Sequence, residues 1–137
     1  MNNRGFTLIE LVTTIALLSI IVVISFVSIN AVIEQGRKND CHSLVSSIKA
    51  AASEYVSDNR YKRSFISGVS GNSITITADV LTNYKYLSTP IYNPFTKEEM
   101  APSTIKIELI LDSDYTVASS NIVEPNVLIT CEVETKE

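Results

Sequence analysis

Tryptophan is absent from this sequence, and the single histidine, two cysteines, four glycines and four prolines are few for 137 residues. So few cysteines and histidines cannot supply the usual ligand set of a structural zinc site. The glycine and proline counts exclude a collagen-like or low-complexity chain. Basic residues are also scarce, 11 against 15 acidic ones, so the net charge of −4 argues against a nucleic-acid binder with a basic surface.

Charge is missing altogether from a long N-terminal stretch, Leu11 to Ile33, and Glu10 is the only charged residue between Phe6 and Ile33. This run exceeds the roughly 20 apolar residues that cross a bilayer as a helix. A secretory signal peptide would have a shorter apolar region, about 7–15 residues, followed by a small-residue cleavage site. Here the small residue, Gly5, precedes the apolar run. The sequence therefore predicts a transmembrane helix.

Glu10 is the anomaly in this segment, because a carboxylate within a bilayer costs a few kcal/mol and needs a cationic partner. Arg4 is one candidate. A second cation would exist if the chain were cut between Gly5 and Phe6, since the new ammonium group would lie four residues before Glu10 on the same helix face. The ammonium group of a neighbouring copy could serve equally well. The alternative is that Glu10 stays hydrated at the membrane surface.

The segment Arg4-Gly5-Phe6-Thr7-Leu8-Ile9-Glu10-Leu11, followed by the apolar run, resembles the start of type IV pilins and type II secretion pseudopilins. The resemblance implies that a prepilin peptidase cuts after Gly5 and methylates the new amine of Phe6. It also implies that Glu10 pairs with the N-terminal amine of an adjacent subunit during assembly. One departure is that no proline occurs before Pro90, whereas many Gram-negative members have a helix-kinking proline in this segment.

The same resemblance implies a domain organisation and a function. A leader of residues 1–5 would precede a membrane and filament-core helix over 6–33 and a pilin head over 34–137. The expected role is a structural subunit of a type IV pilus, with no enzymatic activity, cofactor, metal or nucleic-acid partner. The implied partners are other pilin subunits, the prepilin peptidase, an assembly ATPase and platform protein, and the cytoplasmic membrane. Two alternatives stay open, a pseudopilin of a secretion or DNA-uptake system and an uncleaved membrane-anchored binding module.

The orientation in the membrane rests on the resemblance alone. It implies a head outside the cytoplasmic membrane before assembly and in an extracellular pilus afterwards. The basic residues that flank the apolar run do not determine which end faces the cytoplasm, because Arg4 precedes the run while Arg37 and Lys38 follow it.

Apolar residues continue at helical spacing beyond the membrane segment, in a stripe that predicts packing against a domain. The stripe consists of Cys41, Leu44, Val45, Ile48, Ala52, Tyr55 and Val56. We therefore expect one helix from about Phe6 to about Tyr61, with Gly36 as its weakest point because glycine destabilises a helix interior by about 1 kcal/mol.

The C-terminal part has the pattern of a small sheet. Strands are expected over 73–77, 104–111, 115–118 and 127–133, a short helix over 78–87, and loops over 64–72 and 89–102. An antiparallel sheet of three or four strands against the outer half of the long helix gives an α+β fold, type IV pilin-like. The segment Tyr86–Thr96 is also similar to the "YL…P…[D/N]P" stretch of many pseudopilins and short pilins.

The two cysteines are expected in the seam between the long helix and the sheet, Cys41 on the helix stripe and Cys131 on the buried face of the last strand. They form either a disulfide or two buried free thiols. Other polar groups do not suggest chemistry. Asp40, His42 and Ser43 point in different directions on a helix and cannot form a relay, and Asp112 to Asp114 lacks the ligand run of a calcium loop.

Overall fold

The computed structural model describes residues 5–131, and its first element is the helix α1, Leu8–Asn59. The predicted long helix is therefore confirmed, and Gly36 continues it. Hydroxyl groups within the apolar run donate to backbone carbonyls of the same helix. Thr13 donates to the Ile9 oxygen over 2.7 Å and Ser25 to the Ile21 oxygen over 2.8 Å. These bonds satisfy the polar side chains without water, as a bilayer requires.

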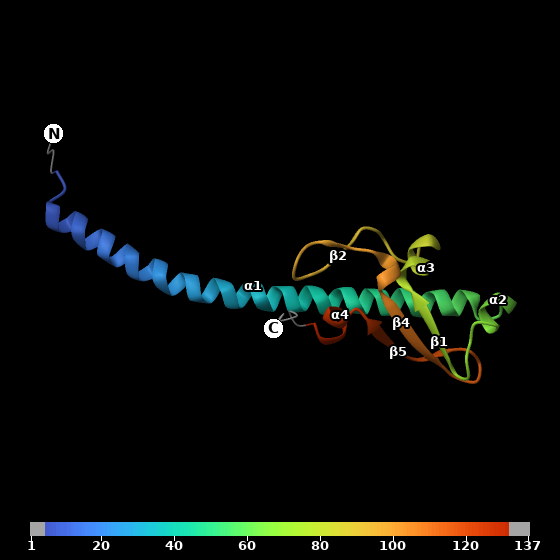
Figure 1. Cartoon of the computed structure of the whole chain (residues 1–137). Coiled ribbons are helices and arrows are strands. Elements are labelled where there is room, and N and C mark those ends of the chain that lie inside the picture. Colours follow the sequence, from blue (N-terminus) through green and yellow to red (C-terminus); the bar gives the residue numbers. More distant parts are fainter. Residues whose placement is uncertain (1–4, 132–137) are drawn as a thin grey trace. The chain divides into compact units, whose positions relative to one another are not determined.

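The chain divides into two compact units, one ending at Gly36 and the other beginning at Arg37, and α1 contributes to both (Figure 1). In the first unit every described side chain is exposed. Buried side chains occur only in the second unit, as far as residues 5–131 are described. The hydrophobic core is therefore that of the second unit, which contains the outer half of α1.

The second unit is built on a three-stranded antiparallel sheet. Its strands are β1, Ser73–Thr77, β4, Lys106–Leu111, and β5, Val117–Glu124, in the order β1-β4-β5. Residues of β4 alternate between half-buried and buried, as the period of two in a strand requires. Together with α1 this sheet makes an α+β layout like that of type IV pilins, as predicted.

The apolar stripe of α1 packs on the inner face of this sheet. Ile48, Ala52 and Val56 are fully buried in one cluster with Ile107 and Leu109 of β4. Figure 1 shows the sheet strands running beside the outer half of α1. The core of the head is thus the helix–sheet seam that the spacing of the apolar residues predicts.

The prediction of a last strand over 127–133 is wrong. The structure has a helix there, α4, Asn126–Thr130, after Pro125 ends the longer strand β5. A short apolar run does not distinguish strand from helix by its periodicity alone. The amide of Cys131 donates to the Val127 oxygen over 3.1 Å, closing a helical turn. Val127 and Cys131 are still both buried, because positions i and i+4 share a helix face. Val133 lies outside the described residues.

Other boundaries also differ from the prediction. The helix α3 is shorter than expected, Ala78–Asn83, because the chain turns at Lys85, which has a φ of 65° in the left-handed region. The segments predicted as loops contain several short helices and strands. These are α2, Arg63–Ile66; the hairpin of β2, Ile91–Tyr92, and β3, Glu99–Met100; and the 3₁₀ turn η1, Pro102–Thr104.

Candidate processing and assembly segment

The start of α1 is fixed by a capping arrangement between Thr7 and Glu10. The amide of Glu10 donates to Thr7 Oγ1 over 3.4 Å, and the amide of Leu11 donates to the Thr7 carbonyl over 3.2 Å. The Thr7 hydroxyl also donates to Glu10 Oε2 over 3.5 Å. Thr-x-x-Glu at the head of an apolar run is the sequence signature of such a capped helix start. The helix therefore begins at Leu8, and Gly5 and Phe6 precede it.

The Gly5–Phe6 peptide bond lies outside the helix and outside the core. The Phe6 side chain is 78% exposed, and a Cβ atom placed on Gly5 would meet no other atom within 4 Å. This bond is therefore open to an enzyme from its surroundings.

Glu10 lies in the first turn of α1, where the helix dipole favours a negative charge. Among residues 5–131 its carboxylate contacts the Thr7 hydroxyl and forms no ion pair. A neutral hydroxyl stabilises a carboxylate less than a cationic group would. Among residues 5–131 the negative charge of Glu10 therefore has no cationic counterpart.

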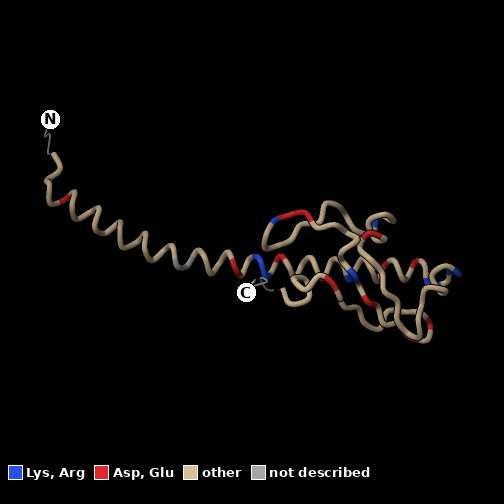
Figure 2. The backbone as a smooth tube through the Cα atoms, viewed as in Figure 1, with Lys and Arg blue, Asp and Glu red and all other residues tan. Residues whose placement is uncertain are grey.

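The apolar part of α1 is long enough and apolar enough to cross a membrane, the one helix of the described chain with that property. Figure 2 shows a single acidic position near the start of this helix, then a long stretch without charge, and mixed charges over the rest of the chain. The exposed large side chains of this stretch include Leu17, Leu18, Ile20 and Phe26. Water is a poor solvent for so much contiguous apolar surface.

Comparison with protein families gives one match, to the model described as prokaryotic N-terminal methylation motif, over residues 1–26. The chain carries the type IV pilin and pseudopilin signature. The match covers Gly5, Phe6 and Glu10 together with the first part of α1. A search of the curated proteins and of the solved structures found no match. The pilin-like identity thus rests on the N-terminal motif together with the α+β fold of the head.

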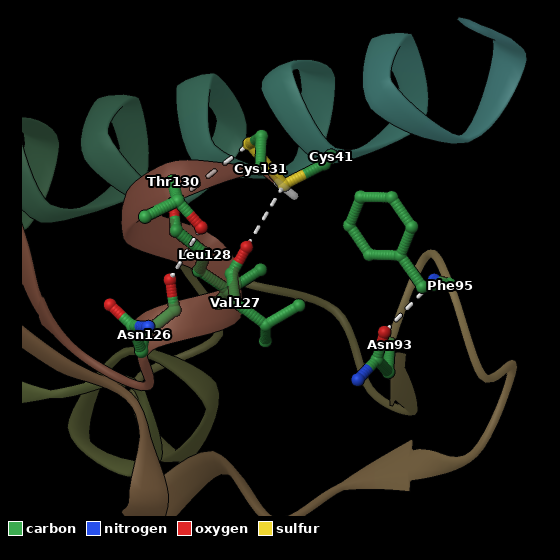
Figure 3. Close-up of a disulfide and its surroundings, with 8 residues drawn as sticks. All are labelled: Cys41, Asn93, Phe95, Asn126, Val127, Leu128, Thr130 and Cys131. Carbon is green, nitrogen blue, oxygen red and sulfur yellow. Dashed lines mark hydrogen bonds between the residues drawn. A yellow bond between two sulfur atoms is a disulfide. The ribbon is translucent and has the colours of Figure 1, made fainter. Parts of the chain in front are cut away.

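In this pilin-like protein Cys41 and Cys131 are joined by a disulfide (Figure 3). Their Cα atoms lie 5.6 Å apart, within the range of about 4.4–6.8 Å that a disulfide spans. Both residues are buried, and the Cys41 sulfur lies 3.7 Å from the Val127 carbonyl oxygen. The bond connects α1 to the residue that follows α4.

The segment Tyr86–Thr96 is anchored to the rest of the head at both ends. The Tyr86 hydroxyl donates to Asp58 Oδ2 of α1 over 2.7 Å, and this bond is the main cause that raises the pKa of Tyr86. Asn93 Oδ1 accepts the amide of Phe95 over 2.9 Å, and Phe95 is buried. Sequence reasoning missed the Tyr86–Asp58 pair, because the two residues are 28 positions apart and the likeness of Tyr86–Thr96 to a family stretch does not indicate a partner on α1.

The remaining polar candidates stay apart. His42 and Asp40 are exposed on α1, and Asp112 and Asp114 are exposed in the turn between β4 and β5. Within the part of the chain that is described, no three side chains of the metal-binding types come together. The pilin-type motif belongs to structural proteins.

Proposed function

We propose that this protein is the structural subunit of a type IV pilus, made as a prepilin. A prepilin peptidase cuts between Gly5 and Phe6, methylates the Phe6 amine, and leaves residues 1–5 as the leader. The observation that carries this proposal is the exposed, non-helical Gly5–Phe6 bond directly before the capped apolar helix of a chain with the N-terminal methylation motif.

The apolar surface of α1 has two successive environments in this proposal. Before assembly, residues 6–33 hold the subunit in the cytoplasmic membrane, with the head, residues 34–137, on the outside. An assembly ATPase and a platform protein then extract the subunit. In the extracellular filament the exposed side chains, among them Leu11, Ile15 and Val22, pack against the same segment of other pilin subunits. Burial of apolar surface favours both states over exposure to water.

Glu10 supplies the specificity of assembly. Cleavage creates an ammonium group on Phe6, and the same group on the adjacent subunit pairs with the Glu10 carboxylate. Two opposite charges attract strongly where water is excluded. This attraction favours the joining of a subunit at the end of a growing filament, where the Phe6 ammonium group of the adjacent subunit lies near Glu10.

The decisive experiment is the intact mass and N-terminal sequence of the protein purified from its native host. The expected result is loss of residues 1–5 and addition of one methyl group to Phe6. A full-length, unmethylated chain would contradict the proposal and favour an uncleaved anchor. The filament from which the processed protein is recovered, a surface pilus or a secretion pseudopilus, tests which system it serves.

A second experiment tests assembly. The variant Glu10→Ala is expected to insert into the membrane at the normal level but to be depleted from sheared filaments. Glu98→Ala, which removes an exposed acid from the head, is the matched control and should assemble normally. Filaments containing Glu10→Ala at the level of the control would remove the role of Glu10.

A further inference from the structure

A hollow of about 450 Å³ lies where the end of α1 and α2 meet the turn between β4 and β5. Its walls include Arg60, Tyr61 and Ile66 from the helical side and residues 113–116 from the turn. A smaller hollow of about 160 Å³ shares Ser113 and Tyr115 with it, so the two adjoin along the turn. The larger volume falls in the range of small-molecule sites, roughly 300–1,000 Å³.

Arg60 brings a charged guanidinium group to the wall of this hollow. Its Nε atom is buried and has no hydrogen-bond partner among the residues that the structure describes. Its guanidinium carbon lies 4.7 Å from the centroid of the Tyr61 ring, which holds the planar group over an aromatic face. A guanidinium group in the wall of a hollow favours a ligand that offers an oxygen atom as hydrogen-bond acceptor.

Tyr115 lines both hollows. The turn is closed by the amide of Asp112 donating to the Thr116 oxygen over 2.8 Å and by the amide of Tyr115 donating to the Asp112 oxygen over 2.9 Å. Tyr115 has a φ of 57°, a left-handed conformation that is uncommon for a bulky residue. Glycine or asparagine would form this turn with less strain, so the tyrosine is not explained by the turn alone.

We propose that this hollow binds the ring of an uncharged saccharide. Arg60 and Asp114 carry opposite charges, so the lining has no net charge and favours neither an anion nor a cation. A hydroxyl group both donates and accepts, which suits a lining that holds both a carboxylate and a guanidinium group. The faces of Tyr61 and Tyr115 suit the apolar C–H face of a sugar ring, and the hydroxyls of Ser113 and Thr116 add further partners. The site does not depend on polymerisation of the chain.

The test is saturation-transfer difference NMR on the full chain in micelles of a detergent without sugar groups, with glucose, galactose and N-acetylglucosamine as separate probes. At least one probe is expected to show signals from its ring protons. The variant Arg60→Gln should raise the dissociation constant about tenfold, as expected for loss of a hydrogen bond from a charged donor. Tyr61→Ala, at a residue that is 77% exposed, should also weaken the signal.

The matched control is Arg63→Gln, which removes the same charge three residues further along from a position that does not line the hollow. Its binding should equal that of the unaltered chain, and near-ultraviolet circular dichroism checks that each variant is folded. Absence of signal from all three sugars would overturn the proposal. So would equal signals from the unaltered chain and the folded Arg60→Gln variant, or stronger binding of glucuronate or glucosamine than of the neutral sugars.

Discussion

Cys41 on α1 and Cys131 after α4 are joined by a disulfide although they are 90 residues apart in the sequence. The bond closes a loop that contains the outer end of α1, the whole sheet and the β2–β3 hairpin. The end of the described chain is therefore fixed covalently to the helix on which the head is built. In the exported location that we propose for the head, an oxidising environment would preserve such a bond.

The disulfide is expected to contribute strongly to the stability of the head. Closing a loop of this length is worth about 4–5 kcal/mol in the chain-entropy model. The double variant Cys41→Ala/Cys131→Ala should lower the free energy of unfolding by an amount of this order, measured by denaturant titration of the tyrosine near-ultraviolet signal. A reductant should destabilise the natural chain and leave the double variant unchanged. Two free thiols in the native protein under denaturing, non-reducing conditions would contradict the bond.

The Tyr86–Asp58 pair predicts a dependence of stability on high pH. The hydrogen bond to Asp58 raises the pKa of Tyr86 above its ordinary value of 10.0, so the folded head holds the phenol proton more tightly than the unfolded chain does. The contribution is therefore fully present below pH 10 and is lost as the pH rises through the higher pKa of the folded state. Ultraviolet titration of tyrosinate should show a high-pH component that disappears in Tyr86→Phe.

Asp58→Asn provides a second arm for this prediction, since it removes the negative charge beside the phenol and should move that component to lower pH. Tyr92→Phe is the control, because it removes a tyrosine that is 52% exposed on β2 and should leave the component in place. A high-pH component that persists in Tyr86→Phe would show that the pair does not cause it.

Leu109 is fully buried near the centre of β4. We expect the stability of the head to be highly sensitive to substitution at such a position. Leu109→Ala removes apolar contacts and leaves a cavity, which should lower the free energy of unfolding by about 2–5 kcal/mol. The control is Val123→Ala on β5, where the side chain is 43% exposed and the expected change is below about 0.5 kcal/mol. Hydrogen exchange of the sheet amides measures both, and equal protection in the two variants would contradict this position of the core.

The sequence alone determined the features that depend on local pattern. The uncharged run from Leu11 to Ile33 fixed a membrane-length helix, because its composition leaves no other way to satisfy the backbone in lipid. The helical spacing from Cys41 to Val56 fixed which face of α1 is buried. The start at Leu8 came from the structure, since the sequence predicted a helix from about Phe6. The alternation in β1 and β4 likewise fixed two strands of the sheet, since one face of each had to be covered.

Only the tertiary structure decided the features that depend on partners far along the chain. The run from Val127 to Cys131 is short and apolar, which suits a strand or a helix equally, and packing behind Pro125 made it the helix α4. The bond between Cys41 and Cys131, the hydrogen bond from Tyr86 to Asp58, and the hollow beside Arg60 each join segments 28 to 90 residues apart or from separate elements. Periodicity places a residue on a face of its own element, but it carries no information on which distant element covers that face.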